Sequence, residues 1–324
     1  MKVLVTGSRG VLGTPLVKEL ESRGHIVYGC DLTHSHTSNY SKCNIAEYRE
    51  IKRTLESVNP DFVVNLAAEF GRKNGEEYYE SLWKSNVIGL RHILEIQKEM
   101  KFKLVHASSS EVYGDVDVDC IREDTPFAHP QNDYAVTKVV NEIQITNFRD
   151  LFGNQIITPR FFNSYGPGEY YSNYRSVVCL FCYRALHNIP YDVYEGYHRV
   201  VLYIDDFIPT LANCVDMFVD GEFVNIGGNE YTSVKDISDT ILKQLGKDDY
   251  YVDYLSKDVH TTKNKRPDIT KAVKLLKHDP KVKIEEGVAK TLEWMKRVYN
   301  CKESHDIFED EWEIVDTAIR RRSC

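Results

Sequence analysis

No run of apolar residues in this 324-residue sequence is long enough to cross a membrane. A long basic run is missing too, apart from Arg320–Arg322, and the formal net charge is −8. We therefore expect neither a membrane protein nor a general nucleic-acid-binding surface, so a polyanionic ligand would need local positive sites. The opening MKVLVTGSRG turns polar after five residues, which predicts the start of a strand and not a signal peptide.

Cysteines in disulfide or metal-site patterns are also scarce. The eight cysteines are scattered at positions 30, 43, 120, 179, 182, 214, 301 and 324. This spacing predicts the reduced thiols of a cytoplasmic protein. Cys179 and Cys182 have zinc-ligand spacing, but no second pair exists and SVVCLFCYRALHN has helical apolar spacing. We predict core thiols and no metal site. Cys120 has no chemistry that requires it.

Strand-like and helix-like segments alternate through the first half of the sequence. The expected strands are KVLVTG, HIVYGCD, and residues 61–68, 103–109 and 155–162. The expected helices cover residues 14–24, 46–58, 76–99 and 134–150. Strands without strict polar alternation, separated by helices, predict an α/β fold with a Rossmann-like, doubly wound parallel sheet covered on both faces.

This rhythm breaks after about residue 165. Tyr- and Gly-rich connections follow, with helices expected near 176–187, 206–218, 233–245 and 283–299. We predict that residues 1–165 form the Rossmann-like domain, with a segment near 200–227 returning to it. Residues 166–300 are predicted to form mainly a smaller, C-terminal substrate-binding domain, and residues 301–324 a peripheral tail.

The first motif with chemistry is TGSRGVLG, which follows a strand and opens a helix. Its glycines, at Gly7, Gly10 and Gly13, would let the backbone approach a pyrophosphate at the helix N-terminus. Asp31 lies about 20 residues further on, at the end of the second strand. An acid there binds the adenosine ribose and repels a 2′-phosphate, which favours NAD. Arg9 and the histidines at 34 and 36 keep NADP open as the alternative.

The second motif is YAVTK, with Tyr134 and Lys138 on one face of an expected helix. The ammonium would favour the phenolate, so that Tyr134 could take a sugar hydroxyl proton near neutral pH. Tyr and Lys four residues apart are common by chance. The order of motifs along the chain makes this pair informative: glycine turn, acid, NLAA at 65–68, SSS at 108–110, then the tyrosine and lysine.

This order of motifs resembles the extended short-chain dehydrogenase/reductase family, specifically its NAD-dependent nucleotide-sugar epimerases and dehydratases. The resemblance covers residues 1–298. It implies that the cofactor is held by Gly7, Arg9, Gly10, Gly13, Asp31, Asn44, Ile45, Leu66, Ala67, Ala68, Asn86, Tyr134 and Lys138. Asn44 stands where the family usually has an aspartate for the adenine, and its amide can still form that hydrogen bond.

For the substrate, the resemblance implies a nucleotide-diphosphate sugar. Asn163, Arg199 and Arg266 match residues that face the diphosphate, which would supply the local positive sites. A surface ion pair is the alternative for each arginine. Glu69 and Ser110 match positions that line the site. The Tyr-rich stretch 165–203 would stack a base or sugar, or else pack on itself.

The resemblance also implies a reaction in which Ser109, Tyr134 and Lys138 oxidise carbon 4 of the sugar. A 4-epimerase needs no acid beyond these residues, whereas in 4,6-dehydratases a glutamate at the place of Glu111 removes the carbon 5 proton. The Ser109-Ser110-Glu111 order resembles the GDP-mannose type of dehydratase and the UDP-glucuronate decarboxylases; the dTDP-glucose type has Asp-Glu there.

We therefore predict a 4,6-dehydratase-type enzyme with Glu111 as base. A 4-epimerase or a UDP-glucuronate-type decarboxylase remains the alternative, as does a Glu111 that only orients substrate or caps the turn. A non-catalytic NAD sensor would need a broken set of catalytic residues, which Ser109, Tyr134 and Lys138 do not show. Related enzymes dimerise through paired helices, and the apolar residues of YAVTKVVNEIQITNF predict a homodimer.

Overall fold

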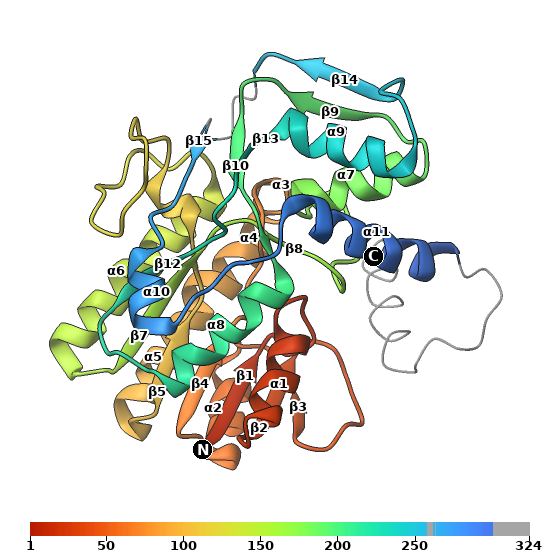
Figure 1. Cartoon of the computed structure of the whole chain (residues 1–324). Helices are drawn as coiled ribbons and strands as arrows, with labels where there is room; N and C mark the ends of the chain where they lie inside the picture. Colours follow the sequence, from red (N-terminus) through yellow and green to blue (C-terminus); the bar gives the residue numbers. More distant parts are fainter. Residues whose placement is uncertain (258–261, 263, 301–324) are drawn as a thin grey trace.

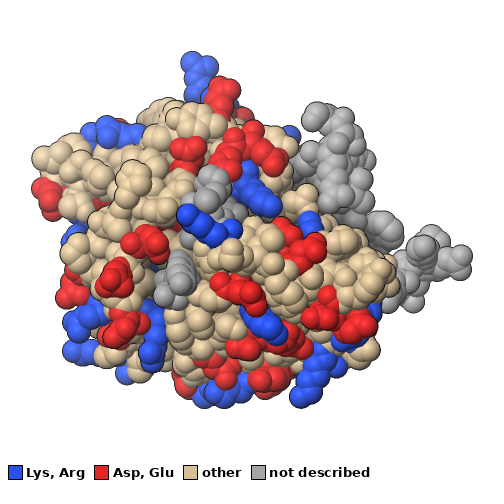
Figure 2. Space-filling view, turned by 90° about the horizontal axis from the view of Figure 1, so that it is seen from above, with Lys and Arg blue, Asp and Glu red and all other residues tan. Residues whose placement is uncertain are grey.

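The computed structural model describes residues 1–257, 262 and 264–300, so the predicted tail at 301–324 lies outside the described residues (Figure 1). In the part of the chain that is described, no helix is both long and apolar enough to span a membrane. Acidic and basic side chains are interspersed over the face seen in Figure 2, without a large area of one sign.

A parallel sheet of eight strands forms the centre of the fold (Figure 1). Its order is β12-β7-β5-β4-β1-β2-β3, with β6 also paired to β7. The strands are β1 (Lys2–Thr6), β2 (Ile26–Asp31), β3 (Tyr40–Lys42), β4 (Phe62–Asn65), β5 (Lys103–His106), β6 (Ser108–Ser109), β7 (Ile156–Phe161) and β12 (Phe223–Ile226). Every pairing is parallel. The predicted Rossmann-like, doubly wound sheet is confirmed.

Helices cover both faces of this sheet because successive strand residues point to opposite sides. Val3 and Val5 of β1 belong to the apolar cluster that includes α1 (Gly13–Ser22) and α8 (Ile204–Asp216). Leu4, between them, belongs to the cluster on the other face. That second cluster is completed by apolar residues of α2 (Tyr48–Val58), α5 (Gly89–Met100) and α6 (Asp133–Phe152). Both faces of the central strands are therefore buried.

The segment before α5 differs from the sequence-based expectation of one helix over 76–99. It contains α3 (Arg72–Glu77), α4 (Tyr79–Trp83) and a π-helical turn, η1 (Lys84–Ile88). Tyr78 leaves helical geometry with φ −122° and ψ 48°. Within the π turn, Asn86 bonds to residues outside the helix, and such side-chain insertions accompany π turns.

Much of the second half of the chain lies above the carboxyl edge of the sheet, whereas β12 joins the sheet and α8 and α10 (Thr270–Leu276) lie beside it (Figure 1). Its other helices are α7 (Val177–Leu186), α9 (Val234–Leu245) and α11 (Ile284–Asn300). Its small sheets pair β8 (Ser164–Tyr165) with β11 (Leu202–Tyr203), β9 (Tyr191–Tyr194) with β14 (Val252–Leu255), and β10 (His198–Val200) with both β13 (Tyr231–Ser233) and β15 (Asn264–Lys265).

One apolar cluster runs without a break from the sheet to α7, α9 and α11. Cys179 and Cys182 belong to it as fully buried thiols, as predicted for core cysteines. The division at residue 165 stays a prediction, because the two halves share this core.

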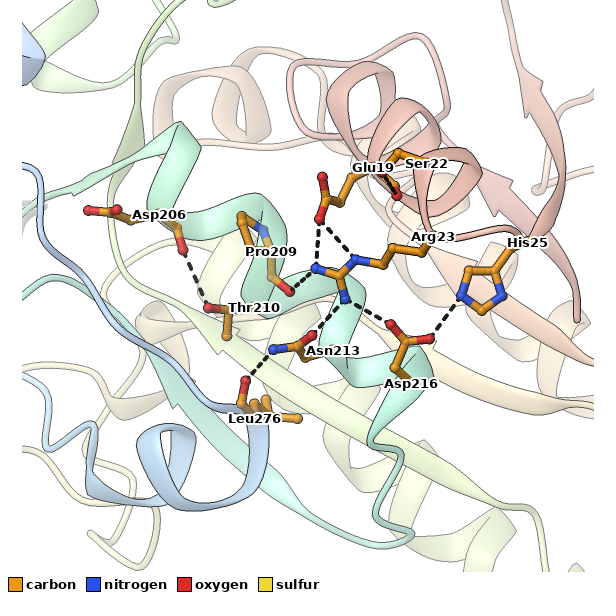
Figure 3. A network of polar contacts seen from close by, with 10 residues as sticks. All are labelled: Glu19, Ser22, Arg23, His25, Asp206, Pro209, Thr210, Asn213, Asp216 and Leu276. Atoms are coloured by element: carbon orange, nitrogen blue, oxygen red, sulfur yellow. Dashed lines mark hydrogen bonds and ion pairs between the residues drawn. The ribbon is translucent and has the colours of Figure 1, made fainter.

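The opposite, amino-terminal edge of the sheet is held by a polar network (Figure 3). Arg23, after α1, donates to Glu19, to Asn213 at 2.6 Å and to Asp216 at 2.8 Å. His25 Nε2 lies 2.8 Å from the other oxygen of Asp216. Arg23 and His25 hold the pKa of Asp216 below its usual value, against the effect of burial. The network links the end of α1 to α8, far from the carboxyl edge.

Candidate active site

The glycine loop between β1 and α1 lies against the segment after β4. Gly7 has a φ of +67°, and a Cβ on it would lie 2.8 Å from the Ala67 nitrogen. A Cβ on Gly13 would lie 2.1 Å from the Gly7 carbonyl oxygen. Side chains are therefore excluded where the strand turns into the helix. This leaves backbone at the α1 N-terminus, the arrangement that accommodates a dinucleotide pyrophosphate.

Asp31 ends β2 beside this loop. One carboxylate oxygen accepts from the Arg9 backbone N–H at 3.1 Å and the other from the Leu32 N–H at 2.7 Å. The Arg9 guanidinium extends away from the acid, donating to Ser35 and Thr37 and lying 5.3 Å from the Tyr40 ring centroid. The loop, the acid and Arg9 thus come together at the carboxyl edge, where the loop backbone can donate to a pyrophosphate and the Asp31 carboxylate can accept from ribose hydroxyls, which fits the adenosine half of NAD.

The other residues expected at the cofactor lie around the same edge. The side-chain oxygen of Asn44 accepts from the Ala46 N–H at 3.0 Å, which leaves the side-chain NH₂ group of Asn44 for a ligand. Ile45 is buried, and its side chain contacts the first turn of α5 at Gly89. Leu66 and Ala67 line the glycine loop, and Ala68 follows them, half-buried.

Hydrogen bonds of Asn86 and Glu69 connect the segment after β4 with η1 and α6. The Asn86 amide accepts from the Glu69 N–H and donates to the Glu69 carbonyl, both at 2.9 Å, and it also donates to Thr137 on α6. The Glu69 carboxylate accepts from Asn74 at 2.8 Å and Ser81 at 2.9 Å. Glu69, expected to line the substrate site, is thus engaged in holding α3 and α4.

Tyr134 and Lys138 lie on the buried side of α6, whose start is fixed by the Asn132 side chain accepting from the Ala135 N–H at 2.8 Å. Lys138 Nζ donates to the Ala107 carbonyl at 2.8 Å and lies 5.7 Å from the Tyr134 ring centroid. Ser109, at the end of β6, is hydrogen-bonded to Tyr134. The structure therefore brings the three predicted residues together.

The protonation states differ from the expectation drawn from the Tyr-Lys spacing. Burial raises the pKa of the Tyr134 phenol, and its hydrogen bond with Ser109 only partly opposes this. Burial lowers the pKa of Lys138 to about 8, although Glu142 one turn along α6 favours the ammonium. Without ligands, Tyr134 is therefore protonated, and its role as a base for a sugar hydroxyl stays a prediction. Burial is the largest cause of both pKa shifts.

Beneath this site, Glu142 belongs to a buried polar network. Its carboxylate accepts from Ser108 at 2.6 Å and from the Arg160 guanidinium at 2.7 and 2.9 Å. Arg160 also donates to the Tyr113 hydroxyl at 2.7 Å. Each buried charge thus has a partner, and the network supports the strand ends that carry Ser109.

Glu111 lies in η2 (Ser110–Tyr113), the short turn after β6, where Ser109 Oγ accepts from its N–H at 3.2 Å. Asn132 donates to one carboxylate oxygen of Glu111 at 3.3 Å, and the Lys265 ammonium contacts the other. Burial alone would raise the pKa of Glu111, but Lys265, Asn132 and Arg199 together hold it below its usual value. Glu111 is therefore an ionised carboxylate beside Tyr134.

The other predicted substrate residues lie on η2, after β7, and on or next to β10 and β15. Asn163 donates to the Val200 carbonyl at 3.3 Å, which ties the end of β7 to β10. Arg199 on β10 donates to the His198 carbonyl at 2.7 Å, and both Arg199 and the exposed Arg266 favour the charged form of Tyr231. Ser110 is buried in η2. The two arginines thus lie near one ring, that of Tyr231.

Sequence reasoning missed Lys265 and Asn132. Lys265 directly precedes the predicted Arg266, and Asn132 lies two residues before Tyr134. These neighbouring positions were the only signal available, because nothing local in NKRPD shows that its lysine meets a carboxylate 154 residues earlier.

Relatives along almost the whole chain carry several different activities. A UDP-N-acetyl-alpha-D-glucosaminuronate decarboxylase of Bacillus cytotoxicus is 28% identical, with 92% of this chain and 99% of that protein covered. A dTDP-glucose 4,6-dehydratase of Salmonella typhimurium is 25% identical, with 91% and 92% covered. At this identity, the relatives agree on the enzyme class but not on one reaction.

Solved structures of epimerases share the fold. A UDP-glucose 4-epimerase of Thermotoga maritima with UDP-glucose has a TM-score of 0.85 and 26% identity, covering 92% of this chain and 100% of that one. A UDP-glucuronic acid 4-epimerase of Bacillus cereus, with UDP-glucuronic acid and NAD, has a TM-score of 0.82, 25% identity and the same coverage.

The family model described as "NAD dependent epimerase/dehydratase family" matches residues 3–227, which is more than half of the chain. The glycine loop and Asp31 fit the cofactor named in that description, so the cofactor is NAD. The chain belongs to the NAD-dependent epimerase/dehydratase family.

Proposed function

We propose that this chain is a nucleotide-sugar 4,6-dehydratase-type enzyme in which Glu111 removes the proton from carbon 5 of the sugar. The observation that supports this is an ionised carboxylate held beside Ser109 and Tyr134 by Lys265 and Asn132. A carboxylate with a shifted pKa beside other reactive groups is a candidate for proton transfer, and Glu111 lies beside Ser109 and Tyr134.

The first stage is oxidation at carbon 4. For this step Tyr134 must be in its phenolate form, which the nearby Lys138 ammonium would favour; the phenolate takes the hydroxyl proton and becomes the phenol, and Ser109 positions that hydroxyl through its contact with Tyr134. The glycine loop and Asp31 would hold NAD, which would supply a hydride acceptor for carbon 4. Arg199 and Arg266 hold the diphosphate of the substrate.

The second stage separates the possible reactions. The carbon 4 ketone acidifies the hydrogen on carbon 5, and an ionised Glu111 can take that proton. A 4-epimerase needs no such base. A decarboxylase loses carbon dioxide without a base and then needs an acid at carbon 5, which an ionised carboxylate is not. The ionised state of Glu111 therefore favours dehydration.

The experiment is an incubation with NAD and the UDP, dTDP, GDP or CDP derivatives of glucose, mannose and uronic acids, in ordinary and deuterated water. We expect a product lighter by one water that contains solvent deuterium. Glu111→Gln should slow its formation by about 10²–10⁴-fold, the usual contribution of a positioned base. The matched control is Glu80→Gln, which removes an exposed carboxylate on α4.

Two other products would contradict the proposal. An unchanged mass with inverted carbon 4 and no deuterium would identify an epimerase. Loss of carbon dioxide from a uronic acid derivative would identify a decarboxylase.

We also propose a homodimer formed through η1 and α6. Ile143 and Leu151 on α6 are 54% and 73% exposed, and Ile88 on η1 is 44% exposed. Gln144 donates to the Val87 carbonyl, which places Ile88 beside the start of this face. Apolar side chains gathered on one surface are typical of an interface.

The dimer can be tested by light scattering coupled to gel filtration. The double variant Ile143→Glu/Leu151→Glu should halve the measured mass, because it places charges in the interface. Tyr250→Glu, which changes an 80% exposed aromatic residue away from α6, should not. A wild-type chain that runs as a monomer would refute the dimer.

A further inference from the structure

Lys265 enters the candidate site from late in the chain, directly before Arg266, and contacts Glu111. It lies on β15, and its neighbour in the parallel pairing with β10 is Arg199. The residue is only 4% exposed, and its ammonium contacts the Glu111 carboxylate. A buried ammonium requires a compensating charge, and Glu111 supplies it.

Loss of water from carbon 6 requires a proton donor as well as a base, because hydroxide is a poor leaving group. Glu111 cannot serve as that donor at the start of the step, since it is ionised. Around Glu111, in the described part of the chain, the interacting groups are Ser109, Asn132, Tyr134, Arg199 and Lys265.

Four of these groups are unsuitable. Serine and asparagine side chains are not acids at neutral pH, and an arginine guanidinium does not give up its proton in proteins. Tyr134 is used at carbon 4. A lysine ammonium can lose a proton and regain it, and it is the group that already contacts the base.

We propose that Lys265 is the proton donor to the departing carbon 6 hydroxyl, so that Glu111 and Lys265 act as a base and acid pair. This role rests on the proposed dehydratase function. It would also explain how a chain with Ser110 beside the base can eliminate water without a second carboxyl group in that turn.

Glu111 takes the carbon 5 proton, the electrons of that bond form the carbon 5–carbon 6 double bond, and the carbon 6–oxygen bond breaks. The oxygen leaves as water with the proton from Lys265. Direct contact then lets the proton on Glu111 pass to the neutral lysine, which restores the carboxylate and the ammonium. Carbon 5 later takes a proton that originates in solvent.

The key variant is Lys265→Arg, which keeps a cation beside Glu111 but cannot release a proton. It is compared with the wild type on two substrates. One is the nucleotide-glucose that the wild type dehydrates, UDP-glucose being the first choice. The other is its 6-deoxy-6-fluoro analogue, whose fluoride leaves without being protonated.

We expect Lys265→Arg to slow water loss by about 10²–10⁴-fold while release of fluoride from the analogue stays within about tenfold of the wild type. The recovered natural substrate should contain deuterium at carbon 5, because Glu111 still removes that proton. Glu111→Gln should lose both water loss and fluoride release, which separates the base from the acid.

Two results would overturn the role of Lys265. Water loss within about tenfold of the wild type in Lys265→Arg would show that no proton from this residue is needed. An equal slowing on both substrates would show that Lys265 only positions Glu111. A wild-type chain that oxidises carbon 4 but never loses water would instead refute the proposed function itself.

Lys265→Met provides an independent readout. Without the ammonium, burial dominates and the pKa of Glu111 should rise. Deuterium exchange at carbon 5 should then begin at a higher pH than in the wild type, whereas Lys265→Arg should leave that onset unchanged. An unshifted onset in Lys265→Met would mean that the contact with Glu111 does not persist in solution.

Discussion

The two sides of the candidate site are built from very different distances along the chain. On the cofactor side, the glycine loop, Asp31 and Arg9 fall within the first 40 residues, and Tyr134 and Lys138 share one helix. On the substrate side, Glu111 meets Lys265 from 154 residues away, next to Arg199 on another strand. The first side is a set of local motifs, whereas the second exists only after β10 and β15 have paired.

This difference explains where chemistry can vary among related proteins. The local motifs lie within residues 3–227, which one family model matches, whereas the relatives along nearly the whole chain bear the names of different activities. In the function proposed above, the fate of the keto sugar depends on which side chains face Glu111, and these come from connections that tolerate change. A fold can thus keep one reaction step and alter the next.

The largest effect is expected where the two sides meet, at Tyr134. Tyr134→Phe keeps the ring but removes the base for the carbon 4 hydroxyl, so turnover should fall by about 10²–10⁴-fold. Carbon 5 exchange should disappear with it, because no ketone forms. Product formation measures turnover, and the deuterium content of the recovered substrate measures exchange at carbon 5. Tyr250→Phe, an exposed ring, is the control; exchange that survives in Tyr134→Phe would show that the two stages are independent.

A smaller effect is expected at the glycine loop, on the cofactor side alone. Gly7→Ala and Gly24→Ala both place alanine at a positive φ, +67° and +82°. The new Cβ at position 7 would lie 2.8 Å from the Ala67 backbone nitrogen. At position 24, no atom would lie within 4 Å of the new Cβ. Both should lower the free energy of unfolding by about 1–2 kcal/mol.

Calorimetric titration with NAD then separates the pair. Gly7→Ala should weaken NAD binding at least about tenfold, equivalent to 1.4 kcal/mol, and Gly24→Ala should not. Equal NAD affinities in the two variants would show that close approach of Gly7 to Ala67 is unimportant for the cofactor.

A pH profile tests Lys138. Because burial lowers its pKa to about 8, the ammonium is present below that pH and lost above it. Single-turnover oxidation of carbon 4 should therefore decline as the pH rises through about 8, where half of the ammonium remains. Lys138→Arg, whose guanidinium stays charged, should lose this decline. A decline that persists in Lys138→Arg must arise from another group.

The smallest effect is expected at the amino-terminal edge of the sheet, away from both sides of the site. Arg23→Met removes the centre of the network in Figure 3, and we expect a loss of about 1 kcal/mol in the free energy of unfolding, without a change in turnover. Lys84→Met, which removes a single exposed ion pair with Glu80, should leave stability unchanged. Urea denaturation of both variants measures the difference.

Local patterns predicted much of the framework. Buried runs such as KVLVTG and the helix from Tyr134 were foreseeable, because a strand or helix with one apolar face is encoded in neighbouring residues. The single helix expected over 76–99 is interrupted at Tyr78, and it contains a π turn where Asn86 bonds to Glu69 and Thr137, contacts that the local pattern does not show. Short strands such as β10, β13 and β15 carry no period of their own and depend on their partners.

By itself, the sequence determined the parallel sheet and the glycine loop with Asp31, since each depends on spacing within one or two elements. The grouping of Ser109 with Tyr134 and Lys138 came from the resemblance to a family. Only the tertiary structure decided the charge state of the site. Burial keeps Tyr134 protonated and lowers the pKa of Lys138, while Lys265 keeps Glu111 ionised. Desolvation and long-range charge pairing depend on the surroundings of a side chain, which its neighbours in sequence do not encode.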